Sequence, residues 1–256
     1  MISIIRADLY RFRKSKVMFG ISIGLIVVLM MGYLGDGQVM LMPDALGLSE
    51  VNYAVKGSEI ILEILRGSNI LAFFLIPIVL HVFVSDFKFQ TIKNTVSYKY
   101  NRIKIYLAKF ITCCLLVLLL VISYIVYGVV LNLLFNNMGG QIYVSSHIIQ
   151  MIKIIALQFP VYAGIIGIMM LIGILFQSST VVSVFTILYI TFSSIFIFLF
   201  KLVDFAKVEP ITFLDKAAHL STLKTHEIVQ IIGIGLLMLI CSVSIGAYIF
   251  SQKDFK

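Results

Sequence analysis

Long apolar runs recur along this chain, and they constrain its fold more than any other feature. A helix that crosses the hydrocarbon core of a bilayer needs about 20 predominantly apolar residues, at about 1.5 Å of rise per residue. The runs that approach or exceed this length are Val17–Leu34, Ile70–Ser85, Leu107–Phe135, Ile154–Phe176, Val181–Phe200 and Ile228–Phe250. The sequence therefore predicts an all-α integral membrane protein with six transmembrane helices. Residues 177–180 predict a tight hairpin between the fourth and fifth.

Composition supports a membrane setting for the whole chain. Of its 256 residues, 61% are hydrophobic and 12% are charged. Soluble domains contain about 45–50% apolar and about 25% charged residues. A soluble globule of this length would expose more surface than so few charges could cover, so most of the apolar area must face lipid. We therefore expect residues 1–256 to form a single transmembrane domain.

The distribution of lysine and arginine predicts the orientation, because positively charged loops stay in the cytoplasm. Basic residues gather before the first span and between the second and third spans, whereas the loop after the first span is mainly acidic. Both termini are therefore predicted to be cytoplasmic, with residues 35–69 and 201–227 as extracellular loops. Within the first of these loops, Ser58–Gly67 predicts a short apolar helix at the outer face. The net charge of +8 fits loops beside anionic lipid better than nucleic-acid binding.

The N-terminal segment, residues 1–16, has the pattern of an amphipathic helix. Ile5, Leu9 and Phe12 recur at helical spacing, while the basic residues Arg6, Arg11, Arg13 and Lys14 fall mostly outside that stripe. This pattern is typical of a helix that lies in the headgroup plane and leads into the first span as an elbow. A pure topology signal is an equal alternative, since basic residues before a first span set orientation by themselves.

The second cytoplasmic segment, residues 86–109, reads DFKFQTIKNTVSYKYNRIKIYLAK. It is too long for a simple hairpin, and its cationic side chains alternate with phenylalanine and tyrosine. Aromatic rings prefer the headgroup level, and ammonium groups prefer water. We therefore expect a short amphipathic helix that projects from the bilayer within residues 86–106.

A resemblance to a known family rests on this segment and on the C-terminal tail. The sequence TIKNTVS at 91–97, followed by Asn101-Arg102 and Tyr106-Leu107-Ala108-Lys109, resembles the first cytoplasmic loop of type-2 ABC transporter permeases. The closing Phe250-Ser251-Gln252-Lys253-Asp254 is similar to the family's end, while Gln90 replaces a glycine found in many relatives. The resemblance implies a coupling helix that seats in a partner ATPase through Lys93, Asn94, Ser97, Tyr98, Asn101 and Arg102.

The resemblance also implies partners and a class of substrate. The chain has no G-x-x-x-x-G-K-[ST] phosphate loop, so ATP and Mg²⁺ would be bound by a separate ABC ATPase subunit, with no cofactor in this chain. A second copy or a sister permease would complete the transporter in a bacterial plasma membrane. Small six-span permeases of this family resemble exporters of, or immunity proteins against, amphipathic peptides such as bacteriocins, lantibiotics and phenol-soluble modulins.

Polar side chains within apolar runs are costly in lipid and mark candidate functional positions. The candidates for a substrate path are His81, Asn132, Gln158 and Tyr124. The alternative for each is a hydrogen bond between helices. Small residues at Gly20 and Gly24, and likewise Ser242 and Gly246, predict close helix packing, either within one subunit or between two permeases.

Two other classes of function were weighed. A membrane-embedded enzyme requires convergent catalytic groups, yet the sequence has no H-E-x-x-H motif and its four histidines are scattered. A stand-alone membrane scaffold or immunity protein would leave the basic 86–109 segment without a cytosolic partner. Neither catalytic nor metal-binding residues are expected, and the placement of Cys113, Cys114 and Cys241 predicts no disulfide framework.

Overall fold

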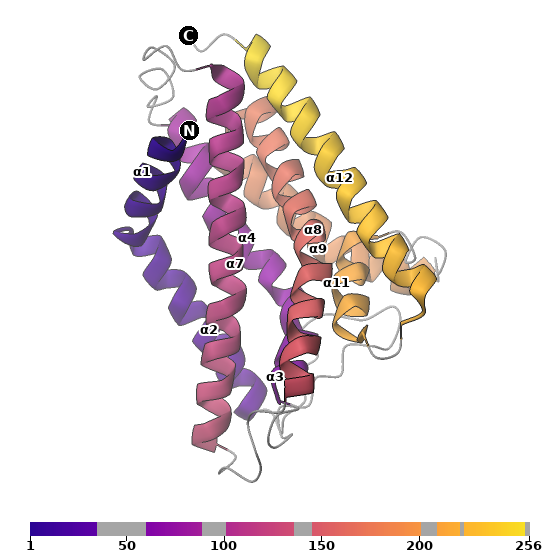
Figure 1. Ribbon diagram of the computed structural model, residues 1–256. Coiled ribbons are helices and arrows are strands. Elements are labelled where there is room, and N and C mark those ends of the chain that lie inside the picture. The colour runs from indigo at the N-terminus through magenta and orange to yellow at the C-terminus, as the bar shows by residue number, and fades with distance from the viewer. Residues whose placement is uncertain (35–59, 89–100, 136–144, 201–208, 221–222, 254–256) are drawn as a thin grey trace.

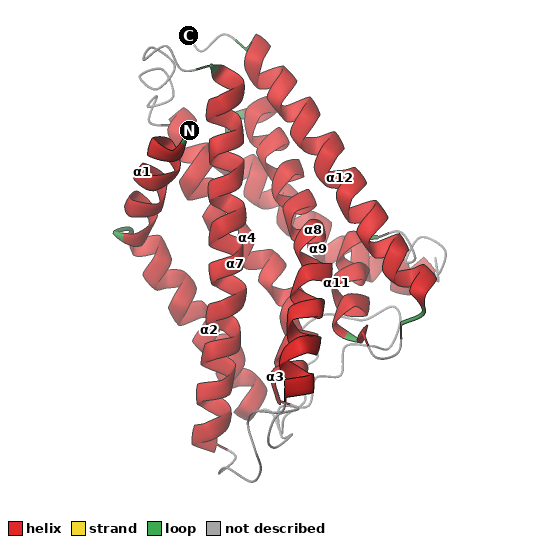
Figure 2. Ribbon diagram, in the orientation of Figure 1, coloured by secondary structure: helices red, strands yellow, loops and turns green. Residues whose placement is uncertain are grey.

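A computed structural model of the chain describes residues 1–34, 60–88, 101–135, 145–200, 209–220 and 223–253 (Figure 1). Within these ranges the regular secondary structure is entirely helical (Figure 2). The prediction of an all-α protein is therefore confirmed for the described part of the chain.

Four described helices are long and apolar enough to cross a membrane. They are Ile61–Phe87, α7 (Arg102–Phe135), His147–Phe176 within α8 (Ser145–Phe176), and α12 (Thr225–Gln252). A fifth is added if α1 (Ile2–Arg13) and α2 (Lys16–Leu34) count as one bent span. The further helix α9 (Ser179–Phe200) is apolar over the shorter stretch Ser179–Phe192. Four to five candidate spans indicate a multi-pass membrane protein, and each predicted apolar run falls on one of these helices.

The N-terminal helices α1 and α2 meet at an elbow. Their axes bend by 61° at a break that contains Lys14 and Ser15. The Ser15 hydroxyl donates to the carbonyl of Phe12 at 2.7 Å, and the Ser15 backbone N–H donates to the same oxygen at 3.0 Å. These bonds satisfy groups left open where the first helix ends, so the chain turns without exposing its backbone.

The second apolar run belongs to a longer helical segment than predicted. It passes through α3 (Ile60–Arg66), η2 (Gly67–Ile70), α4 (Leu71–Val79), the π-helical turn η3 (Leu80–Val84) and α5 (Ser85–Lys88). Residues predicted to form a separate helix at the outer face thus continue into the span. The reason is packing, because Ile64 and Leu65 are fully buried and Gly128 of α7 leaves room for the Ile64 side chain.

Helices α8 and α12 share an interface lined with small residues. A Cβ atom at Gly164 would lie 3.0 Å from the Cβ of Met238, and one at Gly235 would lie 3.1 Å from the Cβ of Pro160. Glycine lets the two backbones approach closely, as is common in membrane helix pairs. The predicted pair Ser242 and Gly246 belongs to this packing within one chain, where Ser242 faces Gly167 on α8 and Gly246 faces the ring of Tyr106.

The predicted pair on α2 has two different surroundings. A Cβ at Gly24 would lie 2.8 Å from the ring of Phe74 on α4, so Gly24 serves packing inside the chain. Gly20 has no such neighbour within 4 Å among the described residues. Only one of the two positions therefore forms a close contact within the described part of the chain.

The turn between α8 and α9 is as tight as predicted. Helix α8 ends at Phe176 and α9 begins at Ser179. Gln177 lies between them with φ of 50°, and its N–H donates to the carbonyl of Gly173 at 3.0 Å. This left-handed residue ends the helix in the manner usually reserved for glycine.

The start of α1 and the end of α12 lie toward the same end of the molecule (Figure 1). That end, here called the terminal face, also holds the start of α7 (Figure 1). Four aromatic rings, those of Phe83, Phe87, Tyr106 and Phe250, pack together near it, with centroids 5.2–6.4 Å apart. The rings fasten η3, α5, α7 and α12 to one another.

Candidate functional site

Four charged side chains, Asp8, Arg11, Asp86 and Lys109, meet near the terminal face and are called the charge cluster. The Lys109 Nζ lies 2.7 Å from Asp8 Oδ1 and 2.6 Å from Asp86 Oδ2. The Arg11 Nη1 lies 2.7 Å from Asp86 Oδ1, and its Nη2 lies 3.5 Å from Asp8 Oδ1. Each carboxylate therefore contacts both Lys109 and Arg11.

The charge cluster is largely removed from solvent. Asp8, Asp86 and Lys109 are 6%, 4% and 5% exposed, while the Arg11 side chain is 39% exposed. Removing an ion from water is costly unless an opposite charge and hydrogen bonds compensate it. Two carboxylates facing two cations satisfy this condition, because the cluster then has no net charge.

The cluster joins three helical elements that are distant in sequence. Asp8 and Arg11 lie on α1, Asp86 lies on α5, and Lys109 lies in the second turn of α7. Asp86 and Lys109 are also the first and last residues of the segment 86–109. Their ion pair therefore closes the base of this segment, and α1 is attached to that base.

Arg11 also binds the irregular turn η3. Its Nη2 donates to the carbonyls of His81 and Val82 at 3.1 and 3.2 Å. A π-helical turn disturbs the regular backbone ladder, and this turn follows Pro77, which has no N–H to donate. The Phe12 ring meets the His81 ring edge-on at 5.7 Å between centroids. Helix α1 thus contacts η3 through the hydrogen bonds of Arg11 and through the packing of Phe12 on His81.

Two further cations bind helix C-termini at the terminal face. Arg102, at the start of α7, donates to the carbonyls of Ser251 and Lys253 at 3.1 and 2.9 Å. The Lys253 ammonium donates to the carbonyls of Ile174 and Leu175 at the end of α8. Cations are favourable at helix C-termini, where carbonyl groups lack intrahelical partners. Burial lowers the pKa of Lys253.

The residues predicted to contact an ATPase are only partly described. Lys93, Asn94, Ser97 and Tyr98 lie outside the described residues. The Asn101 Oδ1 accepts from the N–H of Ile103 at 2.9 Å, which makes Asn101 the N-cap of α7. Arg102 holds the end of α12 within the same chain, so its side chain already has a structural contact there.

The predicted elbow residues divide by exposure. Arg6 and Arg13 are exposed, Leu9 is half-buried and Phe12 is 7% exposed. The apolar stripe of α1 was predicted to face lipid in the headgroup plane. The last residue of that stripe, Phe12, packs against the protein, where its ring meets His81 of η3.

Of the predicted intramembrane polar residues, Gln158, Tyr124 and Asn132 are buried among helices, and His81 is half-buried. Gln158 Nε2 donates to Ser68 Oγ at 2.7 Å and to the carbonyl of Leu214 at 3.0 Å. The Tyr124 hydroxyl donates to the carbonyl of Gly67 at 3.3 Å. Gln158 and Tyr124 are both 0% exposed and Asn132 is 7% exposed. Their surroundings match the alternative prediction of hydrogen bonds and packing between helices, and a substrate contact stays a prediction.

Leu214 belongs to α11 (Pro210–Ala218), which lies within the predicted extracellular loop 201–227. The Glu209 side chain accepts from the N–H of Thr212 at 2.9 Å and caps the start of this helix. Ile211, Phe213 and Leu214 are 2%, 1% and 0% exposed. An amphipathic pattern starting after Glu209-Pro210 was the available signal for this buried helix.

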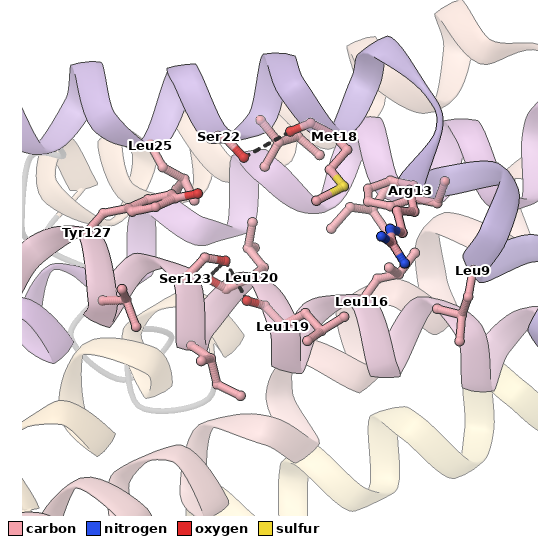
Figure 3. A pocket seen from close by; sticks show the side chains of 15 residues that line it. Leu9, Arg13, Met18, Ser22, Leu25, Leu116, Leu119, Leu120, Ser123 and Tyr127 are labelled. Atoms are coloured by element: carbon pink, nitrogen blue, oxygen red, sulfur yellow. Dashed lines mark hydrogen bonds between the residues drawn. The ribbon is translucent and has the colours of Figure 1, made fainter.

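An open groove separates the elbow and α2 from α7. It has a volume of about 540 Å³, with buried Leu25, Ile78 and Leu120 in its floor and the more exposed Met18 and Leu119 among its other lining residues. Figure 3 shows Arg13 and Tyr127 toward opposite ends of this groove. The sequence pattern of single helices contained no signal for a groove between two of them.

Comparisons of the chain with protein-family models, with curated proteins and with solved structures found no match.

Proposed function

We propose that this chain is the transmembrane permease subunit of an ATP-driven ABC exporter. Six helical spans cross a bacterial plasma membrane, with α2 as the first and α9 as the fifth. Helix α1 lies as an elbow at the cytoplasmic side, where both termini and the segment 86–109 are also located. A separate nucleotide-binding subunit binds ATP and Mg²⁺ and seats on that segment. The lysine and arginine distribution supports this orientation, and so does the location of the start of α1 and the end of α12 toward one end of the molecule.

The single observation that carries the proposal is the closed base of the segment 86–109. Lys109 Nζ bonds Asp86 Oδ2 at 2.6 Å and Asp8 Oδ1 at 2.7 Å. A segment joined at its base moves as a unit with the elements that hold it, whereas an open loop absorbs a displacement in its own backbone. A push from an ATPase on residues 89–100 would therefore reach α1, η3 and α7 together.

The proposed cargo is an amphipathic peptide or another hydrophobic substrate. The support is the family resemblance, together with the wide apolar surfaces of the described helices, of which α12 exposes Val229, Leu237, Ile240 and Ile245. A second copy of the chain or a sister permease would form the other half of the pathway. Export of a toxic peptide by such a complex would give its host immunity.

Co-purification from the native host tests the proposal. The tagged chain, extracted in a mild detergent, should bring down an ATPase subunit and ATP-hydrolysing activity. Lys93→Glu combined with Lys99→Glu should abolish this capture, because both positions lie in the proposed docking segment. Lys153→Glu on α8 is the matched control, since Lys153 is exposed far from the segment. Arg102 is not used for this test because it holds the end of α12.

Capture of no ATPase, or equal capture by the double variant and the wild type, would contradict the permease assignment. A stand-alone scaffold or a membrane-embedded enzyme predicts that outcome. Loss of resistance to an amphipathic peptide in a deletion strain, restored by the wild type but not by the double variant, would identify the cargo class.

A further inference from the structure

The groove between α2 and α7 opens outward, toward the surroundings of the helix bundle. Its floor residues Leu25, Ile78 and Leu120 are 1%, 1% and 4% exposed, whereas Met18 and Leu119 are 43% and 56% exposed. The hydrocarbon core of a bilayer contains no water, so a groove that faces lipid there is filled by apolar chains.

The wall of the groove is apolar along most of its length. The hydroxyl groups in it belong to Ser22, Ser123 and Tyr127. Ser22 donates to the carbonyl of Met18 at 3.1 Å, and Ser123 donates to the carbonyl of Leu119 at 2.5 Å. Among the described lining residues, Arg13 is the charged one. The groove is therefore amphipathic, with a long apolar part and a cation at one end.

Arg13 is the last residue of α1, at the bend into α2, and lies toward one end of the groove (Figure 3). Within the described residues, its guanidinium forms neither an ion pair nor a hydrogen bond that would neutralise it. Arg6, Lys14 and Lys16 add positive charge to the same short stretch of chain. An anionic group at the end of the groove would find a guanidinium fork that suits a phosphate.

The length of the groove along α7 matches an acyl chain of a lipid. On α7 the lining runs from Leu116 to Tyr127, which is about 16 Å at 1.5 Å per residue. This is close to half of a hydrocarbon core of about 30 Å, the depth of one leaflet. The length of the groove therefore suits an acyl chain that extends through one leaflet.

We propose that this groove binds one acyl chain of an anionic phospholipid from the leaflet at the terminal face, with the phosphate held by Arg13. The bound lipid fills the space between α2 and α7 and lies beside the elbow. This site is independent of the proposed transport function, because its geometry requires only a bilayer and the α1–α2 bend.

Native mass spectrometry of the full-length chain tests the site. The chain is purified from its membrane, delipidated and titrated with phosphatidylglycerol or with phosphatidylcholine of the same acyl chains. The wild type should bind one phosphatidylglycerol about fivefold more tightly than phosphatidylcholine, which is the preference expected from one basic residue at a membrane surface. Arg13→Gln should remove that preference, whereas Arg6→Gln, also exposed on α1 but outside the groove, should retain it.

A second pair of variants tests the acyl-chain part of the site. Ser123→Phe places a ring in the groove and should weaken binding of both lipids about tenfold. Val130→Phe places the same ring on an exposed part of α7 outside the groove and should leave binding unchanged. Equal affinity of the wild type for both lipids would overturn the proposal. An unchanged preference for phosphatidylglycerol in Arg13→Gln would also overturn it. So would a Ser123→Phe variant that binds both lipids as the wild type does but no longer forms dimers of the chain.

Discussion

The Oδ2 atom of Asp86 and the Nζ atom of Lys109 lie 2.6 Å apart, and both residues are at least nine-tenths buried. Asp86 lies near the end of one apolar segment, and Lys109 lies about two turns after the start of α7. Their pairing fixes the distance between the two helices at the place where the segment 86–109 leaves and re-enters the bundle. Asp8 and Arg11 extend this pairing to the elbow.

Removal of Lys109 should destabilise the protein strongly. Lys109→Met leaves the two carboxylates with one cation and gives the charge cluster a net negative charge. Loss of one partner of a buried ion pair typically costs about 3–5 kcal/mol. We expect the apparent Tm of the detergent-purified chain to fall by roughly 10 °C, measured by thiol-reactive or intrinsic fluorescence during heating.

A charge-balanced double variant separates electrostatics from lost packing. Lys109→Met with Asp8→Asn again leaves one carboxylate, Asp86, facing one cation, Arg11. This pair should recover a large part of the lost Tm. Lys104→Met removes an exposed lysine of α7 and should change Tm little. A double variant less stable than Lys109→Met would show that charge balance does not govern the cluster.

Arg102→Gln should loosen the end of α12. The guanidinium donates to the carbonyls of Ser251 and Lys253, and a hydrogen bond from a charged donor is worth about 1.5–3 kcal/mol. Hydrogen–deuterium exchange of the amides in 247–253 should become faster, while exchange in the middle of α12 stays unchanged. Lys104→Gln, an exposed change two residues away, should alter neither region. Equal protection of 247–253 in both variants would refute the capping role.

Two glycine-to-alanine changes should have opposite effects on the stability of the protein. Gly167→Ala brings a Cβ to 3.0 Å from the Cβ of Ser242, so α8 and α12 must separate, which costs about 1–3 kcal/mol. Gly233→Ala has no such neighbour within 4 Å among the described residues and should stabilise α12 by about 0.5–1 kcal/mol. Thermal unfolding of the two variants side by side gives the comparison. A lower Tm for Gly233→Ala than for Gly167→Ala would contradict the close packing of α8 on α12 at Gly167.

Gln177 should tolerate glycine better than a branched residue. Its φ of 50° lies in the left-handed region, which costs a non-glycine residue roughly 1 kcal/mol. Gln177→Gly should maintain or raise Tm, and Gln177→Val should lower it because a branched side chain is least compatible with this conformation. Reversed order of the two variants would contradict a left-handed turn between α8 and α9.

The helical apolar segments were predictable from the sequence because long apolar runs leave few alternatives in lipid. The hairpin at residues 177–180 was equally readable, since its four polar residues interrupt one apolar run. The sequence predicted that residues 1–16 form a helix, but it did not predict which surface of the protein this helix covers. Its stripe packs on η3 through Phe12, a contact that depends on where a distant span lies.

The charge cluster could not be found by counting charges. Asp8 and Asp86 are single acids within basic segments, where they only reduce the positive charge that predicts the orientation. Their isolation among cations was the available signal, but only the fold shows that both face Lys109. Residues of η2 and α11 likewise fell within predicted loops. Their burial depends on α8, from which Gln158 and Tyr162 donate to Ser68 in η2 and Gln158 also donates to Leu214 in α11.

The most direct test of the proposed permease function is photo-crosslinking in living host cells. A benzophenone amino acid replaces Tyr98 in the segment 86–109, and the same amino acid replaces Tyr53 in a second strain as a control for the opposite membrane side. We predict that light produces an adduct between position 98 and a cytosolic ATPase subunit, and that position 53 yields none. No ATPase adduct at position 98, or the same adduct from both positions, would contradict the assignment of the segment 86–109 as the ATPase-docking element.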